Sequence, residues 1–356
     1  MYSRTGISLA LITLILALCT GCGKQPAQNQ ELSRNHFVMD TIVTITLHTP
    51  DPQLGEKALD AAFAEFSRID KLADRFAEPG SPAAEESDVC RINQNAGLAP
   101  LTVEKDILTM LEKCHYFSEL SEGAFDATIG PVMDLWGFMD AVQRVPEKQA
   151  LNDALTLVDY RLVMTDREQK TVFLPRDKMK IDLGGIAKGY ATDLAAEELR
   201  RLGITSAIIN AGGNVYALGA KPDGSPWRVG IQDPRDSEKI IAVLNVTDTS
   251  VVSSGDYKRY FTVDGIRYHH IIDPSTGEPA GKMTSVTVVA ANSADADVLS
   301  TALFVTGPER GAELIRELPG VQAVFVDNEQ NILFSQSLEG RIEFLEPENH
   351  PLSMED

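Results

Sequence analysis

The sequence predicts an α+β fold in which one domain spans residues 37–345 and a polar C-terminal tail spans residues 346–356. Strand-like and helix-like segments follow one another without the regular βαβ rhythm of a doubly wound parallel sheet. Hydrophobic residues make up 43% and charged residues 24% of the 356 residues, enough to bury a sizeable core. No linker-like stretch interrupts the sequence after residue 36, which favours a single compact domain.

Apolar residues recurring every three or four positions predict the main helices. In the first of them, over residues 54–76, the apolar positions are Leu59, Phe63, Phe66, Ile69, Leu72 and Phe76. Further helices are expected over 103–120, 188–202 and 294–305, and Gly203 would end the third of the four.

Alternation of apolar and polar residues predicts a half-buried strand over residues 37–47. The dipeptide Asp264-Gly265 favours a two-residue turn and hence a hairpin over 259–271. Other strands are expected over 204–210, 284–290 and 321–326, whereas 78–88 and 124–145, rich in turn-forming residues, are expected to be irregular.

The N-terminus is typical of an exported bacterial lipoprotein. Arg4 precedes a short apolar stretch over residues 7–18, too short to span a membrane. Small residues then lead to Cys22, which would be lipidated once the signal peptide of residues 1–21 is removed, and residues 22–36 would form a flexible tether. A plain secretory signal with a chance cysteine is the alternative. We therefore expect a protein of the cell envelope, outside the cytoplasm, on the periplasmic side in a Gram-negative cell.

The strongly negative net charge limits the classes of molecule that the protein can bind. A net charge of −20 disfavours non-specific binding to nucleic acid and to anionic lipid, so membrane contact is expected through the lipid anchor only. An enzyme this acidic that handles phosphates must neutralise them locally, with a metal, backbone amides or a few placed cations.

Two cysteines, Cys90 and Cys114, remain after removal of the signal. An oxidising compartment permits a disulfide between them, but two buried free thiols explain them equally well. The sequence contains no His/Cys spacing typical of a zinc site.

The most unusual segment is Asp182-Leu-Gly-Gly-Ile-Ala-Lys-Gly-Tyr-Ala-Thr-Asp193. Paired glycines before a predicted helix expose backbone N–H groups that suit a phosphate, and Lys188 could add a positive charge. A tight strand-to-helix connection is an equally good explanation. The polar segments 210–214 and 253–256 could line the same site or serve only as turns.

Three further side chains could carry chemistry. His269 and His270 are adjacent, and in a strand adjacent side chains face opposite ways, so only one of them can point into a site as a general base. Asp297 and Thr301 are four residues apart in a predicted helix and so share one face. A carboxylate with a hydroxyl suits Mg²⁺, although helix capping or solvent exposure would explain the pair as well.

Taken together, these segments resemble the ApbE family of FAD:protein FMN transferases. The resemblance covers roughly residues 37–335 and rests on Met39-Asp-Thr41, Gly123-Ala-Phe-Asp-Ala-Thr-Ile-Gly-Pro131, Asp182-Leu-Gly-Gly-Ile-Ala-Lys-Gly-Tyr190, Ala211-Gly-Gly213, Ser254-Gly-Asp-Tyr257, His270-Ile-Ile-Asp-Pro-Ser-Thr-Gly277 and Asp297-x-x-x-Thr301. The blocks that begin at Asp182 and His270 are the most specific, and Met-Asp-Thr is the weakest.

The resemblance implies a fold and a reaction. The fold would be T-fold-like, with a mixed, largely antiparallel sheet. With Mg²⁺, FAD would be cleaved at its pyrophosphate, FMN joined to a Thr or Ser hydroxyl of an acceptor protein, and AMP released. Acceptors would be flavin-carrying subunits of membrane redox complexes or exported electron carriers.

It also implies the site residues. Mg²⁺ would be held by Asp297, Thr301 and the carbonyl of Gly185, and His270 would be the catalytic base. FAD would contact Met39, Phe76, Ala124, Phe125, Asp126, Asp182, Lys188 and Ile272. Two positions depart from the family pattern: Asp40 stands where Gly is more frequent, and Phe76 stands where several relatives carry Tyr. Phe76 could stack on a flavin or adenine ring, or be the last core residue of its helix.

Two other functions fit the same residues. A Mg²⁺-dependent FAD pyrophosphatase would use water in place of the protein hydroxyl and release free FMN. A non-catalytic FAD-binding lipoprotein would retain intact FAD. A generic nucleotide-binding lipoprotein is disfavoured by the linked motifs.

Overall fold

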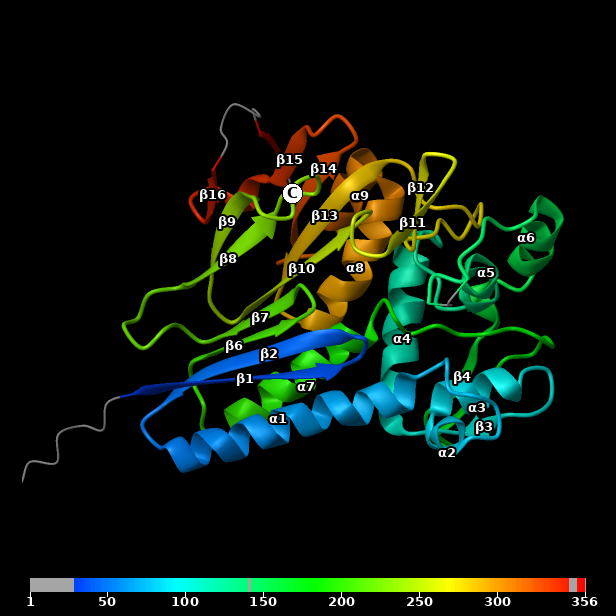
Figure 1. Cartoon of the computed structure of the whole chain (residues 1–356), viewed down its shortest axis with the longest axis horizontal. Helices are drawn as coiled ribbons and strands as arrows, with labels where there is room; N and C mark the ends of the chain where they lie inside the picture. Colours follow the sequence, from blue (N-terminus) through cyan, green and yellow to red (C-terminus); the bar gives the residue numbers. More distant parts are fainter. Residues whose placement is uncertain (1–28, 140–141, 346–350, 356) are drawn as a thin grey trace, which may run out of the picture.

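In the computed structural model, which describes residues 29–139, 142–345 and 351–355, nine of the described strands form one large sheet (Figure 1). Its order is β1-β2-β6-β7-β10-β13-β14-β15-β17. Neighbouring strands pair antiparallel, whereas β15 and β17 pair parallel. The strands are β1 (Gln30–Val38), β2 (Thr41–Thr49), β6 (Ala207–Ala211), β7 (Asn214–Leu218), β10 (Thr249–Gly255), β13 (Met283–Ala290), β14 (Gln322–Asp327), β15 (Ile332–Ser335) and β17 (Leu352–Met354).

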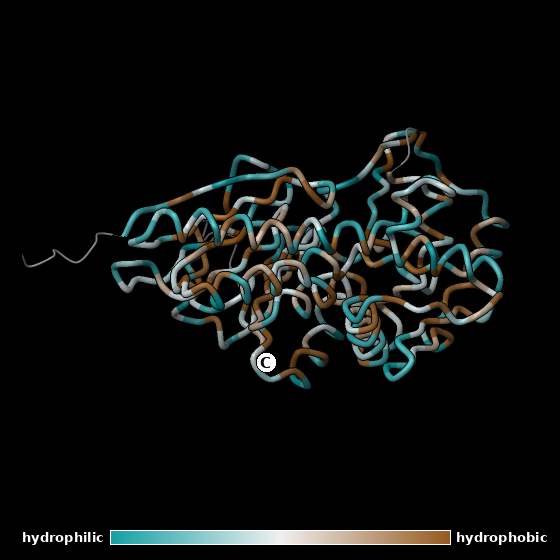
Figure 2. Tube along the Cα trace, turned by 90° about the horizontal axis from the view of Figure 1, so that it is seen from below, coloured by the Kyte–Doolittle hydropathy of each residue, from teal (hydrophilic) through white to brown (hydrophobic). Residues whose placement is uncertain are grey.

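Helices cover one face of this sheet. In β10, Val252 points into the larger core under the helices, while its neighbour Val251 points to the opposite face. In β14, Phe325 likewise faces the helices and Val324 faces away from them. Amphipathic helices suit this position, and the long helical traces in Figure 2 alternate between hydrophobic and hydrophilic residues. The helices on this side are α1 (Pro52–Ala73), α4 (Lys105–Leu120), α7 (Ala187–Arg201), α8 (Ser293–Thr306) and α9 (Pro308–Arg316).

A small three-stranded sheet covers the other face with a second hydrophobic cluster. It has the order β16-β9-β8 and contributes Trp227, Val229 and Leu244 to that cluster. Its strands are β8 (Trp227–Gln232), β9 (Ile240–Val246) and β16 (Ile342–Phe344). Because β10, β13 and β14 are therefore buried on both faces, their backbone is held firmly, which matters for the site attached to them.

A third cluster packs α5 (Gly130–Trp136) and α6 (Lys148–Leu155) against the hairpin of β11 (Tyr260–Val263) and β12 (Ile266–His269). The indole N–H of Trp136 donates to the carbonyl of Gly277 at 2.8 Å. The remaining α-helices and strands flank this end of the molecule (Figure 1): α2 (Pro82–Glu86), α3 (Asp88–Gln94), β3 (Leu101–Thr102), β4 (Met164–Asp166) and β5 (Thr171–Phe173).

The predicted α+β class, the mixed and largely antiparallel sheet, and the single domain are confirmed. The hairpin turn at Asp264-Gly265 lies where expected, and the four predicted helices are α1, α4, α7 and α8. The predicted strands over 204–210, 284–290 and 321–326 are β6, β13 and β14, with ends shifted by one to three residues.

Other predictions need correction. The single strand over 37–47 is a hairpin, because Met39 and Asp40 both adopt positive φ between β1 and β2. Residues 30–36, expected in the tether, therefore lie in β1, and residues 352–354 of the expected tail pair with β15 as β17. Helices α2 and α5 occupy parts of segments expected to be irregular, and α3 begins where the first of these segments ends.

The predicted signal peptide and Cys22 lie outside the described residues. Within the described ranges, none of the helices is both long and apolar enough for a transmembrane span. Cys90 and Cys114 are both buried and both free, so the pairing that the sequence left open is absent from the described structure.

Candidate active site

A cavity of about 490 Å³ lies where the turn before α7, the helix α8, the β1–β2 turn and the segments after β10 and β12 meet. The site residues expected from the sequence all line it, although they come from distant parts of the chain. They are Met39, Phe76, Ala124, Phe125, Asp126, Asp182, Gly185, Lys188, His270, Ile272, Asp297 and Thr301.

The spacing of Gly185, Gly189 and Asp193 explains how the glycine-rich segment builds one wall of the cavity. The three positions are four residues apart, so they follow one face of the segment that enters α7. A Cβ on Gly189 would lie only 2.3 Å from the carbonyl oxygen of Ser293, and glycine there allows α7 and α8 to touch. The Asp193 carboxylate accepts the backbone N–H groups of Ser293 and Ala294, at 2.7 and 2.9 Å, and so caps the start of α8.

The turn itself is fixed by Asp182 and Phe125. The Asp182 carboxylate accepts the N–H of Gly184 at 2.8 Å and lies 3.0 Å from Nε of Arg75. A Cβ on Gly185 would be 2.8 Å from the Phe125 ring and 3.8 Å from the hydroxyl oxygen of Thr301. The absence of a side chain at Gly185 thus brings the turn next to α8.

Asp297 is a buried carboxylate facing this turn. It is 5% exposed, accepts the N–H of Gly189 at 2.9 Å, and lies 4.0 Å from Nζ of Lys188. Lys188 in turn donates to the carbonyl of Gly184 at 3.1 Å. Thr301 follows one helical turn after Asp297, which collects carboxylate, hydroxyl and carbonyl oxygens, the ligand types of hard cations, in one place.

The structure separates the two histidines. Nε2 of His269 donates to the carbonyl of Ala280 at 2.9 Å, and its Nδ1 accepts the N–H of Ile271 at 3.3 Å. Both of its ring nitrogens are therefore engaged in a buried structural role. His270 lines the cavity, as the strand alternation predicted for one of the pair.

His270 is held in one tautomer. The carbonyl of Arg259 lies 3.2 Å from its Nδ1 and can only accept a hydrogen bond, so Nδ1 carries the proton and Nε2 keeps its lone pair. Burial, reinforced by the nearby Arg259, lowers the pKa of His270 to about 3. The imidazole is thus neutral near pH 7 and able to accept a proton at Nε2.

Asp126 lines the cavity, and its carboxylate accepts hydrogen bonds from within the protein. It accepts the backbone N–H and the hydroxyl of Thr128, at 2.7 and 2.6 Å, and the N–H of Tyr160 at 2.9 Å. Burial raises the pKa of this carboxyl group. Asp126 therefore braces the segment that carries Ala124 and Phe125.

Phe76 lies outside α1, which ends at Ala73, and its side chain is 51% exposed. Of the two interpretations left open by the sequence, the last core residue of the helix is therefore excluded. The guanidinium of Arg75 lies 4.6 Å from the centre of the Phe76 ring, and Arg75 is itself tied to Asp134 at 2.5 Å. The ring is positioned at the cavity edge by this buried arginine.

Sequence reasoning missed three cations that line the cavity: Arg75, Lys258 and Arg259. Nζ of Lys258 lies 2.8 Å from where a Cβ of Gly213 would be, and burial lowers the pKa of this lysine, with Lys188 adding to the effect. Lys258 and Arg259 directly follow the Ser254-Gly-Asp-Tyr257 segment, which was the signal that could have located them.

Comparison with known proteins shows which family the chain resembles in sequence. The family model described as the ApbE family matches residues 39–325. The FAD:protein FMN transferase of Treponema pallidum (strain Nichols) is 34% identical over 362 residues, covering 97% of each chain. The protein of the same name from Klebsiella pneumoniae (strain 342) is 33% identical, covering 87% of this chain and 93% of its own.

Solved structures agree with the fold. The ApbE protein of Thermotoga maritima superimposes with a TM-score of 0.80 at 33% identity, over 88% of this chain and 99% of the other. Flavin transferase ApbE from Vibrio cholerae superimposes with a TM-score of 0.77 at 27% identity, over 89% of this chain and all of the other.

Proposed function

The chain belongs to the ApbE family, and we propose that it is a Mg²⁺-dependent FAD:protein FMN transferase that acts on a Thr or Ser hydroxyl of an acceptor protein. One observation supports this most: a single cavity places the buried carboxylate of Asp297, the ammonium of Lys188 and the free Nε2 of His270 around one space. Phosphoryl-type transfer needs little more than positioning, charge neutralisation and a base.

The residues fit a magnesium ion. Asp297 is nearly inaccessible, and its nearest cation, Lys188, stays 4.0 Å away, which leaves its charge incompletely balanced. Among the described residues no three His, Cys, Asp or Glu side chains form a metal-binding group. The oxygens that meet at this turn, and that the family resemblance implies as ligands, are those of Asp297, the Thr301 hydroxyl and the Gly185 carbonyl, and a cation there would take its other oxygens from water and substrate phosphates. When bound, Mg²⁺ would offset negative charge on the pyrophosphate.

The protein side chains supply the remaining steps. His270 accepts the proton of the acceptor hydroxyl at Nε2 while the hydroxyl oxygen forms a bond to the phosphorus of the FMN half. The bond from that phosphorus to the bridging oxygen breaks, and AMP leaves with that oxygen. Lys188, Lys258 and Arg259 provide positive charge at the cavity of a protein with net charge −20. Phe76 offers a ring face to the flavin or the adenine.

One experiment tests the proposal. The purified protein is incubated with FAD, Mg²⁺ and a candidate exported flavoprotein, and protein-bound flavin is read by in-gel fluorescence. Transfer predicts a fluorescent acceptor band that disappears with EDTA, returns with Mg²⁺ and is lost when the acceptor hydroxyl is removed. Free FMN without labelling would indicate the pyrophosphatase, and unchanged FAD in the presence of Mg²⁺ would indicate a flavin-binding protein.

We further propose that the protein is exported and lipid-anchored through Cys22 in the cell envelope, where its acceptors would be flavin-carrying subunits of membrane redox complexes or exported electron carriers. The support is the short apolar stretch that ends in Thr20-Gly21-Cys22. The Cys22→Ala variant should not be processed like the parent or held by the membrane. Membrane fractionation and the mass of the mature protein check this, and normal processing with retained membrane attachment would overturn the anchor.

A further inference from the structure

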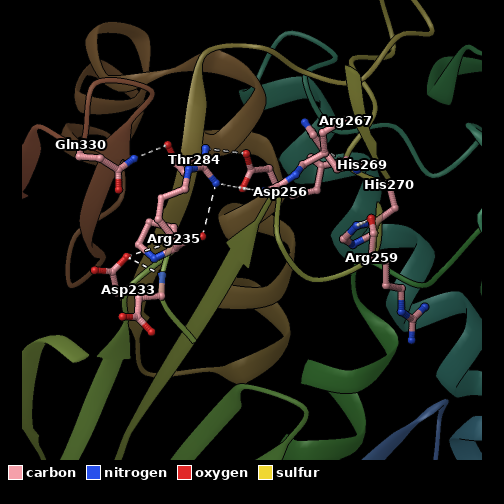
Figure 3. Close-up of polar contacts among 12 residues, drawn as sticks. Asp233, Arg235, Asp256, Arg259, Arg267, His269, His270, Thr284 and Gln330 are labelled. Carbon is pink, nitrogen blue, oxygen red and sulfur yellow. Dashed lines mark hydrogen bonds and ion pairs between the residues drawn. The ribbon is translucent and has the colours of Figure 1, made fainter. Parts of the chain in front are cut away.

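An ion pair outside the cavity, between a partly exposed arginine and a buried carboxylate, joins the β8–β9 loop to the turn that follows β10 (Figure 3). Nη1 and Nη2 of Arg235 donate to the two carboxylate oxygens of Asp256 at 2.7 and 2.9 Å. Nη1 of Arg267 lies 3.7 Å from the same carboxylate, which is nearly inaccessible. Because a two-pronged guanidinium–carboxylate pair fixes orientation as well as distance, Asp256 has little freedom to move.

The backbone around Asp256 is fixed from other sides as well. Its N–H donates to the carbonyl of Thr284 in β13, a strand buried on both faces, at 3.0 Å. The ring of Tyr257 folds back over Gly255, where a Cβ would lie 2.3 Å from the ring. Burial, with Asp256 and Asp233 nearby, raises the pKa of Tyr257 to about 12. Residues 255–257 thus form a packed turn, and the ion pair between Arg235 and Asp256 ties this turn to the β8–β9 loop.

The residues that directly follow this turn, Lys258 and Arg259, line the cavity. The carbonyl of Arg259 accepts both the backbone N–H of His270, at 3.1 Å, and its Nδ1–H, at 3.2 Å. The guanidinium of Arg259 reaches the carbonyl of Asp40 at 3.4 Å and the sulfur of Met139 at 3.3 Å. Figure 3 shows His270 beside Arg259, on the far side of Asp256 from Arg235. A shift of the turn would therefore move the carbonyl that orients the imidazole.

We propose that Arg235 is a positioning residue, which acts through Asp256 and the carbonyl of Arg259 to keep Nε2 of His270 aligned with the acceptor hydroxyl. The proposal rests on the transferase function proposed above. Arg235 and Asp256 do not themselves line the cavity, so they are not expected to contact FAD. A positioning role predicts a loss of kcat without a loss of FAD affinity, whereas a role in stability alone predicts a lower Tm and a normal kcat per folded molecule.

The test compares Arg235→Ala and Arg235→Lys with the control Arg228→Ala. Arg228 lies on β8 and pairs with Glu343 at 3.1 Å, but its carboxylate partner is exposed, whereas Asp256, the partner of Arg235, is buried. Arg235→Ala should lower the FMN transfer rate at saturating FAD about 10- to 100-fold, because small misplacements of catalytic groups are costly. Its FAD dissociation constant, measured by flavin fluorescence, should equal that of the parent. Arg235→Lys should recover part of the rate, because lysine keeps the charge but not the two-pronged geometry, and Arg228→Ala should match the parent.

A double-mutant cycle then asks whether Arg235 acts through His270. In a His270→Ala background, Arg235→Ala should cause little further loss of transfer, because the group that it orients is absent. Multiplicative losses, or a fall in FAD affinity as large as the fall in kcat, would overturn the proposal. If Arg235→Ala does not fold, Arg235→Lys and Asp256→Asn enter the same cycle, and a parental rate in either folded variant would also overturn it.

The two proposals fail in distinguishable ways. If the parent labels no acceptor, or if His270→Ala transfers FMN at the parental rate, the proposed function or its assigned base is wrong. If His270→Ala is impaired while Arg235→Ala is folded and fully active, the transferase proposal stands and only the positioning role of Arg235 is lost.

Discussion

The two walls of the cavity are built in different ways. The inner wall belongs to the core: it consists of Gly184, Gly185, Lys188, Asp297 and Thr301, on the turn before α7, the start of α7 and α8. The outer wall belongs to turns and loops: it consists of Met39, Phe76, Lys258, Arg259 and His270. Helix α8 is buried along most of its length, whereas the hairpin next to the outer wall exposes Tyr260 at 43% and Ile266 at 56%.

The contrast shows how one cavity can combine rigidity with access. Charge neutralisation must be pre-organised, and the inner wall achieves this by direct helix–helix contact at Gly189 and by the Asp193 cap on α8. A protein acceptor has to enter from outside, which suits a rim of loops. The loops of the outer wall must then be held in place by other contacts, and the Arg235–Asp256 ion pair is one of them. The loss of Asp297 in the inner wall should therefore lower turnover most, while substitutions in the outer wall should lower it by amounts that differ from residue to residue.

The largest effect is expected at Asp297. Asp297→Ala should reduce Mg²⁺-dependent FMN transfer by about 10³-fold or more, because the metal is worth several kcal/mol of charge stabilisation. Thr301→Ala should cost less, since a neutral hydroxyl binds a cation more weakly than a carboxylate does. Transfer rates measured against Mg²⁺ concentration check both.

The control for this experiment is Asp295→Asn. Asp295 lies on the same helix but pairs with Lys113 at 2.6 Å and does not line the cavity. Its transfer rate and Mg²⁺ dependence should match the parent. A folded Asp297→Ala protein with the parental Mg²⁺ dependence would remove the metal site and, with it, the distinction between the walls.

His270 should produce the next largest loss. His270→Ala should bind FAD but transfer FMN about 10²- to 10⁴-fold more slowly, as expected when a general base is removed. His269→Ala should cost less activity and more stability, because His269 is buried with both ring nitrogens engaged. Steady-state transfer and thermal unfolding separate the two, and equal activity losses would contradict the assignment.

The low pKa of His270 adds a pH test. A base acts in its neutral form, so activity falls as the pH drops through its pKa. Since burial places the pKa of His270 well below the usual value, the acid limb of kcat/KM should lie well below pH 6.5. An acid limb near pH 6.5 that vanishes in His270→Ala would show a solvated imidazole and an outer wall looser than the structure describes.

The two walls also differ in how well the sequence predicted them. The inner wall follows from local sequence, because paired glycines precede the predicted helix that carries Lys188, and Asp297 and Thr301 share one face of another helix. The family resemblance supplied the other predicted site residues, but not Arg75, Lys258 or Arg259. Local periodicity also located α7 and α8 to within a few residues, and the Asp264-Gly265 turn located the β11–β12 hairpin.

The outer wall depends on contacts that leave no local pattern. Arg235 and Asp256 are separated by 21 residues and meet only because β8 and β9 fold over the sheet. Residues 30–36 of β1 were missed because β1 is an edge strand, largely exposed, so its polar sequence resembles a tether. Phe76 was placed at the end of a helix that in fact stops at Ala73. Long-range pairing, more than local propensity, decides these positions.

Lys258 should give a smaller effect, confined to substrate binding. Lys258→Ala should raise the KM for FAD about tenfold with little change in kcat, since a charged hydrogen bond to phosphate is worth about 1.5 kcal/mol. The increase should shrink at high salt, because the ammonium is partly open to solvent. Lys221→Ala is the control: its Nζ lies 5.7 Å from the Trp227 ring, as that of Lys258 does from Tyr257, but it does not line the cavity. Equal KM values for the two variants would contradict a phosphate-facing Lys258.

The smallest effect is expected at Phe76. Its ring is half exposed, with Arg75 against it at 4.6 Å, so removing it should not disturb the core. Phe76→Ala should weaken FAD binding about fivefold, equivalent to about 1 kcal/mol for an aromatic stack, with kcat at saturating FAD and Tm unchanged. Phe76→Tyr should keep parental affinity because it keeps the ring. Tyr116→Ala is the matched control, since Tyr116 is 53% exposed and does not line the cavity. If Phe76→Ala and Tyr116→Ala bind FAD equally well, the ring does not face the ligand, and the outer wall holds FAD through its charges alone.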